Sequence, residues 1–517
     1  MKVRSSLPSS LAATLTATLP ATLAAALVLG PAQPCGAIDT IQLKIPLLET
    51  SFSLRLSELA DPTRLFDGTS DFAEINRATG GKLGQQLRKV LNTPLPLPMG
   101  HVLRQSVGTP LLEQALLVLS TLGTVHGQPP DLSGRLLQQA LETVVAQGHP
   151  TVLTLLRAIP GDSVSVDLGR ATSVLERLVA QQRLADRLLA KAPAATAPLQ
   201  GSFPGPLPVR ERSAALTVSH RSVPLQVVLV EPAQGGNGRL VLISHGLWDS
   251  PASFLGWARV LASRGYTVLL PIHPGSDKSE QQAMLSGKAP PPSAAELRLR
   301  PLDLKRLMDG AAAAQLGLAA GTDASKVVVV GHSWGATSAL QLAGVRPSSN
   351  QLVQRCLDTT DADRNLSWTL QCSWKSAADE AALADPRVIA VAAVSPPTHL
   401  LFDYGAARDL SGRVLLVSGS RDWVVPPGPE AIEPFRGALG QGHQLVLAEG
   451  GDHFNLRPLA AADGGVLGAL LVAWVEGSFA AGEGVRPGRS APPLLPPGGW
   501  GHAAMPLVDV TGQLSPL

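Results

Sequence analysis

From residue 209 onward, short runs of β-branched and aliphatic residues alternate with segments whose apolar residues recur at helical spacing. This alternation constrains the fold most, because strands that alternate with helices form a mostly parallel sheet flanked by helices. The expected strands are Leu225–Val230, Leu240–Ile243, Thr267–Leu270, Val327–Val330, Val388–Val394, Val414–Val417 and Gln444–Leu447. We therefore predict an α/β domain over residues 209–481.

The chain has 517 residues, more than one hydrophobic core usually organises, so a second domain is expected. Apolar residues recur mainly at helical spacing in 38–191, which predicts a helix-rich N-terminal domain, with 163–168 as a candidate strand. We assign no chemistry to it. The Ala- and Pro-rich stretch 192–208 predicts a linker, and the Pro- and Gly-rich stretch 482–517 predicts a flexible or surface-hugging tail.

Residues 1–37 have the layout of a secretory signal, with Lys2 and Arg4 followed by an apolar run and small residues. We expect cleavage near Ala37 and export to the periplasm or the extracellular space, with no transmembrane span in the mature chain. The alternative is an uncleaved membrane anchor, although Pro20 interrupts the apolar run and no basic cluster follows it.

Loss of this segment would remove two of the 42 Lys and Arg residues and leave them equal in number to the 40 Asp and Glu residues. No basic cluster indicates nucleic-acid binding. The mature chain would keep two cysteines, Cys356 and Cys372, which an exporting compartment would allow to form a disulfide; two buried free thiols are the alternative.

The strongest chemical signal is Gly331-His332-Ser333-Trp334-Gly335, which follows one expected strand and precedes a helical pattern. A serine on such a sharp strand-to-helix turn is typical of a nucleophile. Its hydroxyl needs a base, and the chain supplies Asp422 and then His453, each just after a later strand. Ser333, Asp422 and His453 are therefore the predicted nucleophile, acid and base.

The oxyanion that forms during acyl transfer needs preorganised donors. Ser244-His245-Gly246-Leu247 follows an early strand, so the backbone N–H groups of Leu247 and Trp334 are the expected donors. Asp403 is a rival for the role of acid. His245, His332 and Asp452 are expected to be structural, and no spacing of metal ligands predicts a catalytic metal or another cofactor.

Tryptophans cluster in sequence near these positions, which predicts an apolar, aromatic-lined substrate pocket formed by Trp248, Trp368 and Trp423. Ordinary core packing is the alternative for each of them. Residues 346–385 interrupt the sheet pattern and are expected to form a cap over the site, stiffened by the two cysteines.

Several segments resemble the bacterial predicted dienelactone hydrolase branch of the α/β hydrolases, and are similar to platelet-activating-factor acetylhydrolases. They are Ser244-His245-Gly246, His273-Pro274-Gly275-Ser276, Arg300-Pro301-Leu302-Asp303 and Gly331-His332-Ser333-Trp334-Gly335. Residues 38–191 are similar to an uncharacterised helical domain that precedes such hydrolases in exported proteins. The resemblance implies the α/β-hydrolase fold and its triad. Dienelactone hydrolases use a cysteine where this chain has Ser333, and the acetylhydrolases take their acid from an earlier loop.

The residues together predict a serine-dependent carboxylic ester hydrolase that acts on apolar acyl or aromatic esters, including lipids, without a cofactor. A peptidase or acyltransferase on the same fold is one alternative, and a catalytically inactive binding module is another.

Overall fold

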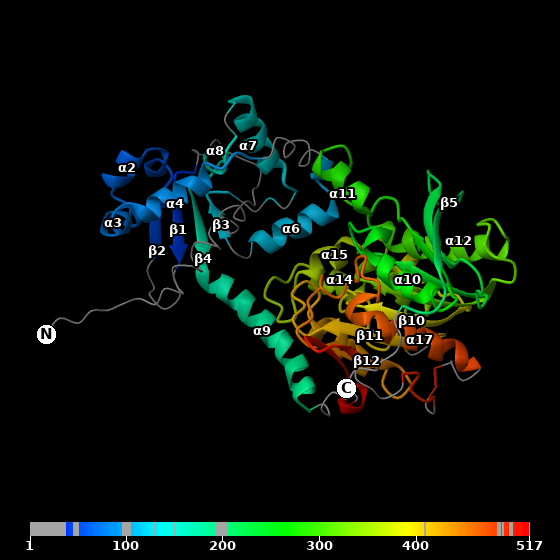
Figure 1. The fold of residues 1–517 in the computed structure, drawn as a ribbon. Helices are drawn as coiled ribbons and strands as arrows, with labels where there is room; N and C mark the ends of the chain where they lie inside the picture. Colours follow the sequence, from blue (N-terminus) through cyan, green and yellow to red (C-terminus); the bar gives the residue numbers. More distant parts are fainter. Residues whose placement is uncertain are drawn as a thin grey trace. The chain divides into compact units, whose positions relative to one another are not determined.

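The computed structural model describes residues 38–515, except for 45–50, 96–104, 121–122, 129–130, 132, 149, 192–203, 408–409, 483–486, 489–490 and 496–499. The chain divides into two compact units (Figure 1). Unit 1 comprises Met1–Glu176 and Ala283–Pro291, and unit 2 comprises Arg177–Gln282 and Pro292–Leu517. The predicted signal and most of the predicted linker lie outside the described residues. Within those residues, no helix has the length and apolar character needed to cross a membrane.

Unit 1 combines helices with a small sheet of strand order β2-β1-β4-β3. The strands are β1 (Thr40–Lys44), β2 (Ser51–Arg55), β3 (Gly123–His126) and β4 (Ser163–Asp167). The helices are η1 (Glu58–Ala60), α2 (Pro62–Phe66), α3 (Asp71–Ala78), α4 (Lys82–Leu91), α6 (Pro110–Ser120), α7 (Arg135–Ala146) and α8 (Val152–Ala158). Among these strands, the sequence pattern indicated only β4.

Unit 2 is built on a sheet of order β13-β14-β12-β11-β10-β9-β7-β8-β6-β5. Its central strands, from β12 to β8, are parallel, and antiparallel strands complete both edges. The strands are β5 (Val209–Leu216), β6 (Leu225–Pro232), β7 (Arg239–Ser244), β8 (Thr267–Pro271), β9 (Asp323–His332), β10 (Val388–Val394), β11 (Arg413–Gly419), β12 (Gln444–Ala448), β13 (Trp500–His502) and β14 (Met505–Asp509). The expected strands are all present, and β5, β13 and β14 are additional.

Helices cover both faces of this sheet, because successive strand residues point to opposite sides. Along β9, for example, Val327 and Val329 pack in one core and Val328 and Val330 in the other. Helices α12 (Glu296–Ala312), α13 (Trp334–Leu342) and α16 (Glu433–Arg436) contribute to the first core, and α10 (Leu255–Ala262) and α17 (Gly468–Ala480) to the second. The shorter helices are η2 (Pro251–Phe254), α11 (Lys278–Leu285), α14 (Asn350–Arg355), α15 (Ser367–Ser373), η3 (Ala378–Glu380), η4 (Gly428–Ile432), η5 (Gly465–Leu467) and η7 (Thr511–Gln513).

The C-terminal tail differs from the flexible or surface-hugging extension expected from its composition. Strand β14 pairs with β12, and β13 pairs with β14, so the tail extends the sheet. Upstream, the side chain of Gln444 accepts hydrogen bonds from the amides of Leu494 and Leu495 at 2.9 and 3.0 Å. Edge strands as short as β13 and β14 show little alternation of apolar and polar residues. The prediction for the tail therefore depended on its Pro- and Gly-rich composition.

The second half of helix α9 (Leu168–Lys191) belongs to unit 2. Ala185 and Leu188 are buried in one of its cores, and Arg177 donates to the backbone oxygen of Asp361 at 3.0 Å. Unit 2 therefore begins inside a helix that the sequence pattern assigned wholly to the N-terminal domain.

Candidate active site

Ser333 occupies the turn between β9 and α13, at the carboxyl end of a central strand. Its backbone has φ 54° and ψ −125°, a conformation that a residue with a side chain rarely adopts. The amide of Ser333 donates to the carbonyl oxygen of Val394 on neighbouring strand β10 at 2.8 Å, which holds the turn against the sheet. The predicted nucleophile thus has the strained strand-to-helix geometry expected from its motif.

Two residues after Ser333, the chain has room only for a glycine, Gly335. A Cβ atom there would collide with the backbone carbonyls of Ser244 and His245. The first turn of α13 therefore packs directly on the loop that follows β7. This close approach brings the predicted oxyanion loop to the predicted nucleophile.

Asp422 and His453 are in direct contact. Nδ1 of His453 lies 2.9 Å from Oδ2 of Asp422, and both side chains are buried. The other carboxylate oxygen accepts the amides of Val424 and Val425 at 2.9 and 2.7 Å. Since a carboxylate oxygen accepts, Nδ1–H of His453 is the donor in this contact, and Nε2 lies on the other side of the ring.

His332 links the nucleophile segment to the base. Its Nε2–H donates to the backbone oxygen of His453 at 2.9 Å, and the two rings lie 4.8 Å apart between centroids. Burial holds the pKa of His332 well below its usual value, so the ring stays neutral. The residue before Ser333 therefore positions the backbone of His453, a structural role as the sequence suggested.

The backbone amides of Leu247 and Trp334 lie on the two segments that Gly335 brings together. In the part of the chain that the structure describes, neither amide donates a hydrogen bond within the protein. Next to Leu247, Trp248 adopts φ 56°, again an unusual conformation for a residue with a side chain. These unpaired amides fit the expected oxyanion donors.

Neither alternative carboxylate contacts His453 among the described interactions. Asp403 accepts hydrogen bonds from the side chains of Asn350 and Gln351, at 2.8 and 3.5 Å. Asp452 accepts the amides of Phe454 and Asn455 and shapes its own loop. Asp422 is therefore the carboxylate that the fold brings to the imidazole.

The tryptophans predicted to line a pocket have different surroundings. Trp423 is 48% exposed and lies 6.1 Å from the ring of Phe454, which is 47% exposed. Trp248 is half-buried. Trp368, by contrast, is fully buried, and the guanidinium groups of Arg355 and Arg364 lie 5.0 and 5.1 Å from its ring centroid. Its place in a substrate pocket stays a prediction. Phe454, which directly follows His453, is an exposed aromatic residue that the sequence reading missed.

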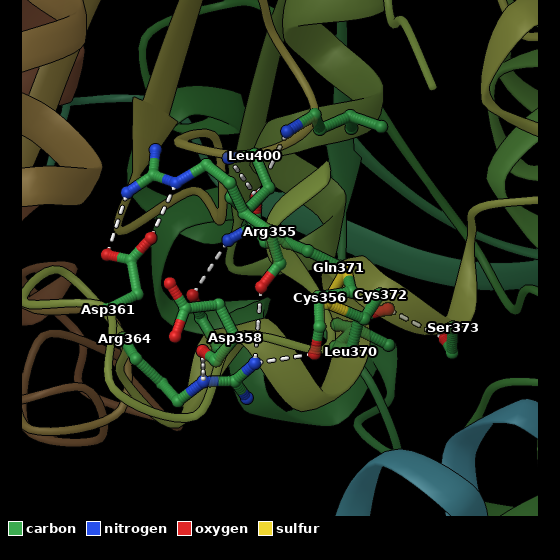
Figure 2. The surroundings of a disulfide bond; sticks show 12 residues. Arg355, Cys356, Asp358, Asp361, Arg364, Leu370, Gln371, Cys372, Ser373 and Leu400 are labelled. Atoms are coloured by element: carbon green, nitrogen blue, oxygen red, sulfur yellow. Dashed lines mark hydrogen bonds and ion pairs between the residues drawn. A yellow bond between two sulfur atoms is a disulfide. The ribbon is translucent and has the colours of Figure 1, made fainter. Parts of the chain in front are cut away.

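The insertion 346–385 contains α14, α15 and η3 and is cross-linked internally by the Cys356–Cys372 disulfide. Figure 2 shows Arg364 beside this bond, donating to the backbone oxygens of Cys356 and Asp358. Buried apolar side chains of the insertion pack with Trp334, the residue after the nucleophile. Whether the insertion covers a substrate remains a prediction.

Glu430 in η4 is a buried carboxylate that sequence reasoning missed. Its oxygens accept hydrogen bonds from side chains of the insertion, namely Asn365, Ser367 and Gln371. They also accept the amides of Thr398 and His399 at 2.7 and 2.9 Å. No motif surrounds Glu430, and only its partners from distant segments reveal its role as an anchor of the insertion.

Within the described residues, no group of three or more His, Cys, Asp or Glu side chains has an arrangement that could hold a metal ion. The expectation that no metal or cofactor is needed stays a prediction.

One family model matches part of unit 2. Residues 239–357 match the family model described as the alpha/beta hydrolase fold. The match runs from β7 to residue 357, within the insertion, and includes the expected oxyanion loop and Ser333. It agrees with the mixed sheet and its flanking helices, and supports a hydrolase of the α/β-hydrolase superfamily. Among curated proteins, no sequence matches this chain.

Proposed function

We propose that the protein is a serine-dependent carboxylic ester hydrolase with Ser333 as nucleophile, His453 as base and Asp422 as the acid that orients it. The observation that carries the proposal is the buried 2.9 Å contact between His453 Nδ1 and Asp422 Oδ2, together with the strained turn at Ser333, whose neighbour His332 bonds to the backbone oxygen of His453. This combination supports acyl transfer, since an oriented neutral imidazole is what a serine hydroxyl requires.

In the proposed reaction, Nε2 of His453 removes the hydroxyl proton as Ser333 Oγ attacks the ester carbonyl. The amides of Leu247 and Trp334 would stabilise the oxyanion, and the N-terminus of α13 adds a favourable partial charge. The protonated His453 then donates its proton to the leaving alcohol. Water, activated by the same imidazole, hydrolyses the acyl-enzyme and regenerates Ser333.

The proposed substrates are apolar acyl or aromatic esters. Two exposed rings, Trp423 and Phe454, directly follow the proposed acid and base. The ring of Phe454 lies 5.4 Å from that of His453, so an ester within reach of the base would lie close to it. Exposed aromatic surface of this kind favours apolar groups over charged ones.

We also propose that the protein is exported. The disulfide Cys356–Cys372 supports this, because such bonds persist in oxidising compartments. Cleavage near Ala37 would be checked by mass spectrometry of the mature chain.

A fluorophosphonate probe tests the proposed nucleophile directly, since it forms a covalent bond with an activated serine. Labelling of the wild type and its loss in Ser333→Ala are expected, together with loss of p-nitrophenyl ester hydrolysis. Ser338→Ala, on the helix that follows the nucleophile, is the matched control and should keep labelling. An unlabelled wild type would falsify the proposal.

Substrate range is a separate question. The test uses p-nitrophenyl esters whose acyl chains have two to twelve carbons. We expect kcat/KM to rise with the length of the acyl chain. Each 1.4 kcal/mol by which burial of the acyl chain stabilises the transition state corresponds to an increase of about 10-fold. A preference for small charged esters would remove the proposed apolar specificity and leave the nucleophile unaffected.

A further inference from the structure

A second Ser-His-Asp relay lies beside the candidate site. The hydroxyl of Ser244, at the end of β7, lies 2.9 Å from Nε2 of His273. Nδ1 of His273 lies 2.8 Å from Oδ2 of Asp303 on α12. The carboxylate accepts from Nδ1–H, so Nε2 accepts the proton of the Ser244 hydroxyl.

Burial separates this relay from the proposed catalytic one. Ser244, His273 and Asp303 are each 0% exposed, whereas Ser333 keeps 8% of its surface accessible. A substrate carbonyl cannot reach Ser244 Oγ without unfolding the loop around it. The relay is therefore a structural element and not a second nucleophile.

Asp303 is fixed by more than the relay. It also accepts from Nε2 of His220 at 2.7 Å and from Arg221 at 2.7 and 2.9 Å. Burial alone would raise the pKa of Asp303, but these bonds and the one from His273 keep it well below its usual value. Arg221 also pairs with Glu296 at 2.7 Å, which ties the start of α12 to the same cluster.

The cluster holds the loop Ser244–Trp248 from several sides. Besides the Ser244 bond, the amide of His273 donates to Nε2 of His245 at 3.2 Å. The amide of Trp248 donates to the carbonyl oxygen of Ser276 at 2.8 Å. Arg300, fully buried over the ring of Trp334 at 4.8 Å, donates to the backbone oxygen of His245.

Ser333 limits movement of this loop from the opposite side. A Cβ atom on Gly246 would lie 3.0 Å from the Cβ atom of Ser333, so the loop has little room to move toward the nucleophile. Between the held ends lies Leu247, whose amide makes no hydrogen bond in the described part of the protein. Small shifts of the loop therefore change the position of that amide relative to Ser333.

We propose that Ser244, His273, Asp303 and Arg300 are positioning residues that clamp the loop Ser244–Trp248 and aim the Leu247 amide at the reacting oxygen. This inference rests on the proposed ester hydrolase function for its kinetic consequence. The clamp itself is a property of the fold and can be measured without activity.

The test compares Ser244→Ala with Ser478→Ala. Ser478 on α17 is also 0% exposed and donates a hydrogen bond, at 2.7 Å to the backbone oxygen of Trp474, far along the chain from the loop. Each variant thus loses one hydrogen-bonded hydroxyl from a side chain that is fully buried. Ser244→Cys, which keeps the shape of the side chain with a slightly larger atom and a weaker donor, is measured in parallel.

With p-nitrophenyl acetate, Ser244→Ala is expected to lower kcat by about 10-fold with KM within 2-fold, because an oxyanion donor acts mainly in the transition state. Ser244→Cys should recover part of kcat, and Ser478→Ala should keep the wild-type value. Wild-type kcat in a folded Ser244→Ala, or an equal loss in Ser478→Ala, would overturn the inference.

Hydrogen exchange separates this inference from the proposed function. Amides in a peptide covering 244–248 are expected to exchange faster in Ser244→Ala and Ser244→Cys than in Ser478→Ala. Unchanged exchange in both Ser244 variants would overturn the clamp even if the enzyme is active. A wild type that neither reacts with fluorophosphonate nor hydrolyses esters would overturn the proposed function alone, and exchange would still decide on the clamp.

Discussion

Single side chains in this protein are oriented by backbone groups as much as by one another. Asp422 uses one oxygen for His453 and the other for the amides of Val424 and Val425. An Asn at position 422 has only one side-chain oxygen. Its amide N–H groups would therefore face either the amides of Val424 and Val425 or Nδ1–H of His453, all of which are donors. It would then favour the tautomer of His453 that has its proton on Nε2.

Asp422→Asn is therefore expected to lower kcat for p-nitrophenyl acetate by about 10³–10⁴-fold while the protein stays folded. Asp403→Asn is the control, because the side chain of Asp403 contacts only Asn350 and Gln351 among the described hydrogen bonds. Steady-state kinetics and circular dichroism of both variants provide the check. An equal loss in the two variants would refute the assignment of Asp422.

At the scale of elements, the insertion 346–385 is held by one covalent bond and one buried carboxylate. The disulfide joins the residue after α14 to α15 across 16 residues, and Glu430 joins α15 to the loop after β10. These two connections act on the same small core, which contains Trp334. The insertion is thus coupled to the turn that carries Ser333.

Glu430→Gln is expected to destabilise the protein by about 1–3 kcal/mol, because an amide nitrogen would face donors that now point at a buried carboxylate. Glu433→Gln is the matched control, since Glu433 is partly exposed and its ion pair within the described residues, with Arg436 at 3.3 Å, is local. Urea unfolding of both variants measures the difference. Equal midpoints would mean that Glu430 does not anchor the insertion.

The disulfide predicts a second effect at this scale. Replacing both Cys356 and Cys372 by Ala should lower the free energy of unfolding by about 3 kcal/mol in the chain-entropy model. A changed preference among acyl chain lengths is also expected if the insertion covers the substrate. Should neither stability nor preference change, the cap hypothesis must be dropped.

At the scale of the whole molecule, several buried histidines stay neutral in the folded state. Burial lowers the pKa of His273 to about 4 and that of His443 to about 3, and it holds those of His245 and His332 well below their usual values. In the unfolded chain each would take up a proton near pH 6.5. Between about pH 4 and 6.5 the unfolded state therefore binds more protons.

Stability is consequently expected to be complete above pH 6.5 and to fall as the pH drops toward 4, by up to about 1.4 kcal/mol per pH unit for each such histidine. Thermal or urea unfolding between pH 5 and 8 measures this slope before most carboxylates titrate. His443→Gln, which cannot take up a proton, should make the slope shallower. A flat profile in the wild type would contradict the neutral burial of these rings.

Local patterns in the sequence were sufficient for the central sheet and for the order of the candidate site residues. Each expected strand has its own run of aliphatic residues, and Ser333, Asp422 and His453 each follow such a run. Strand and turn propensities depend on neighbours along the chain, so they can be read before the fold is known. The same holds for the strained turn at Ser333, which its flanking glycines indicated.

Only the tertiary structure decided which distant groups meet. The anchor at Glu430, the pairing of edge strand β14 with β12 and the relay of Ser244, His273 and Asp303 all depend on partners tens of residues away. The same is true of the burial of Trp368, which lies in one cluster with Leu297, Trp334 and Leu400. The sequence contained the relay as three separate motifs without indicating their contact. Such groups are brought together by the pairing of strands and the packing of helices. These contacts cannot be read from a local pattern, because the free energy of burying apolar surface is shared over the whole core.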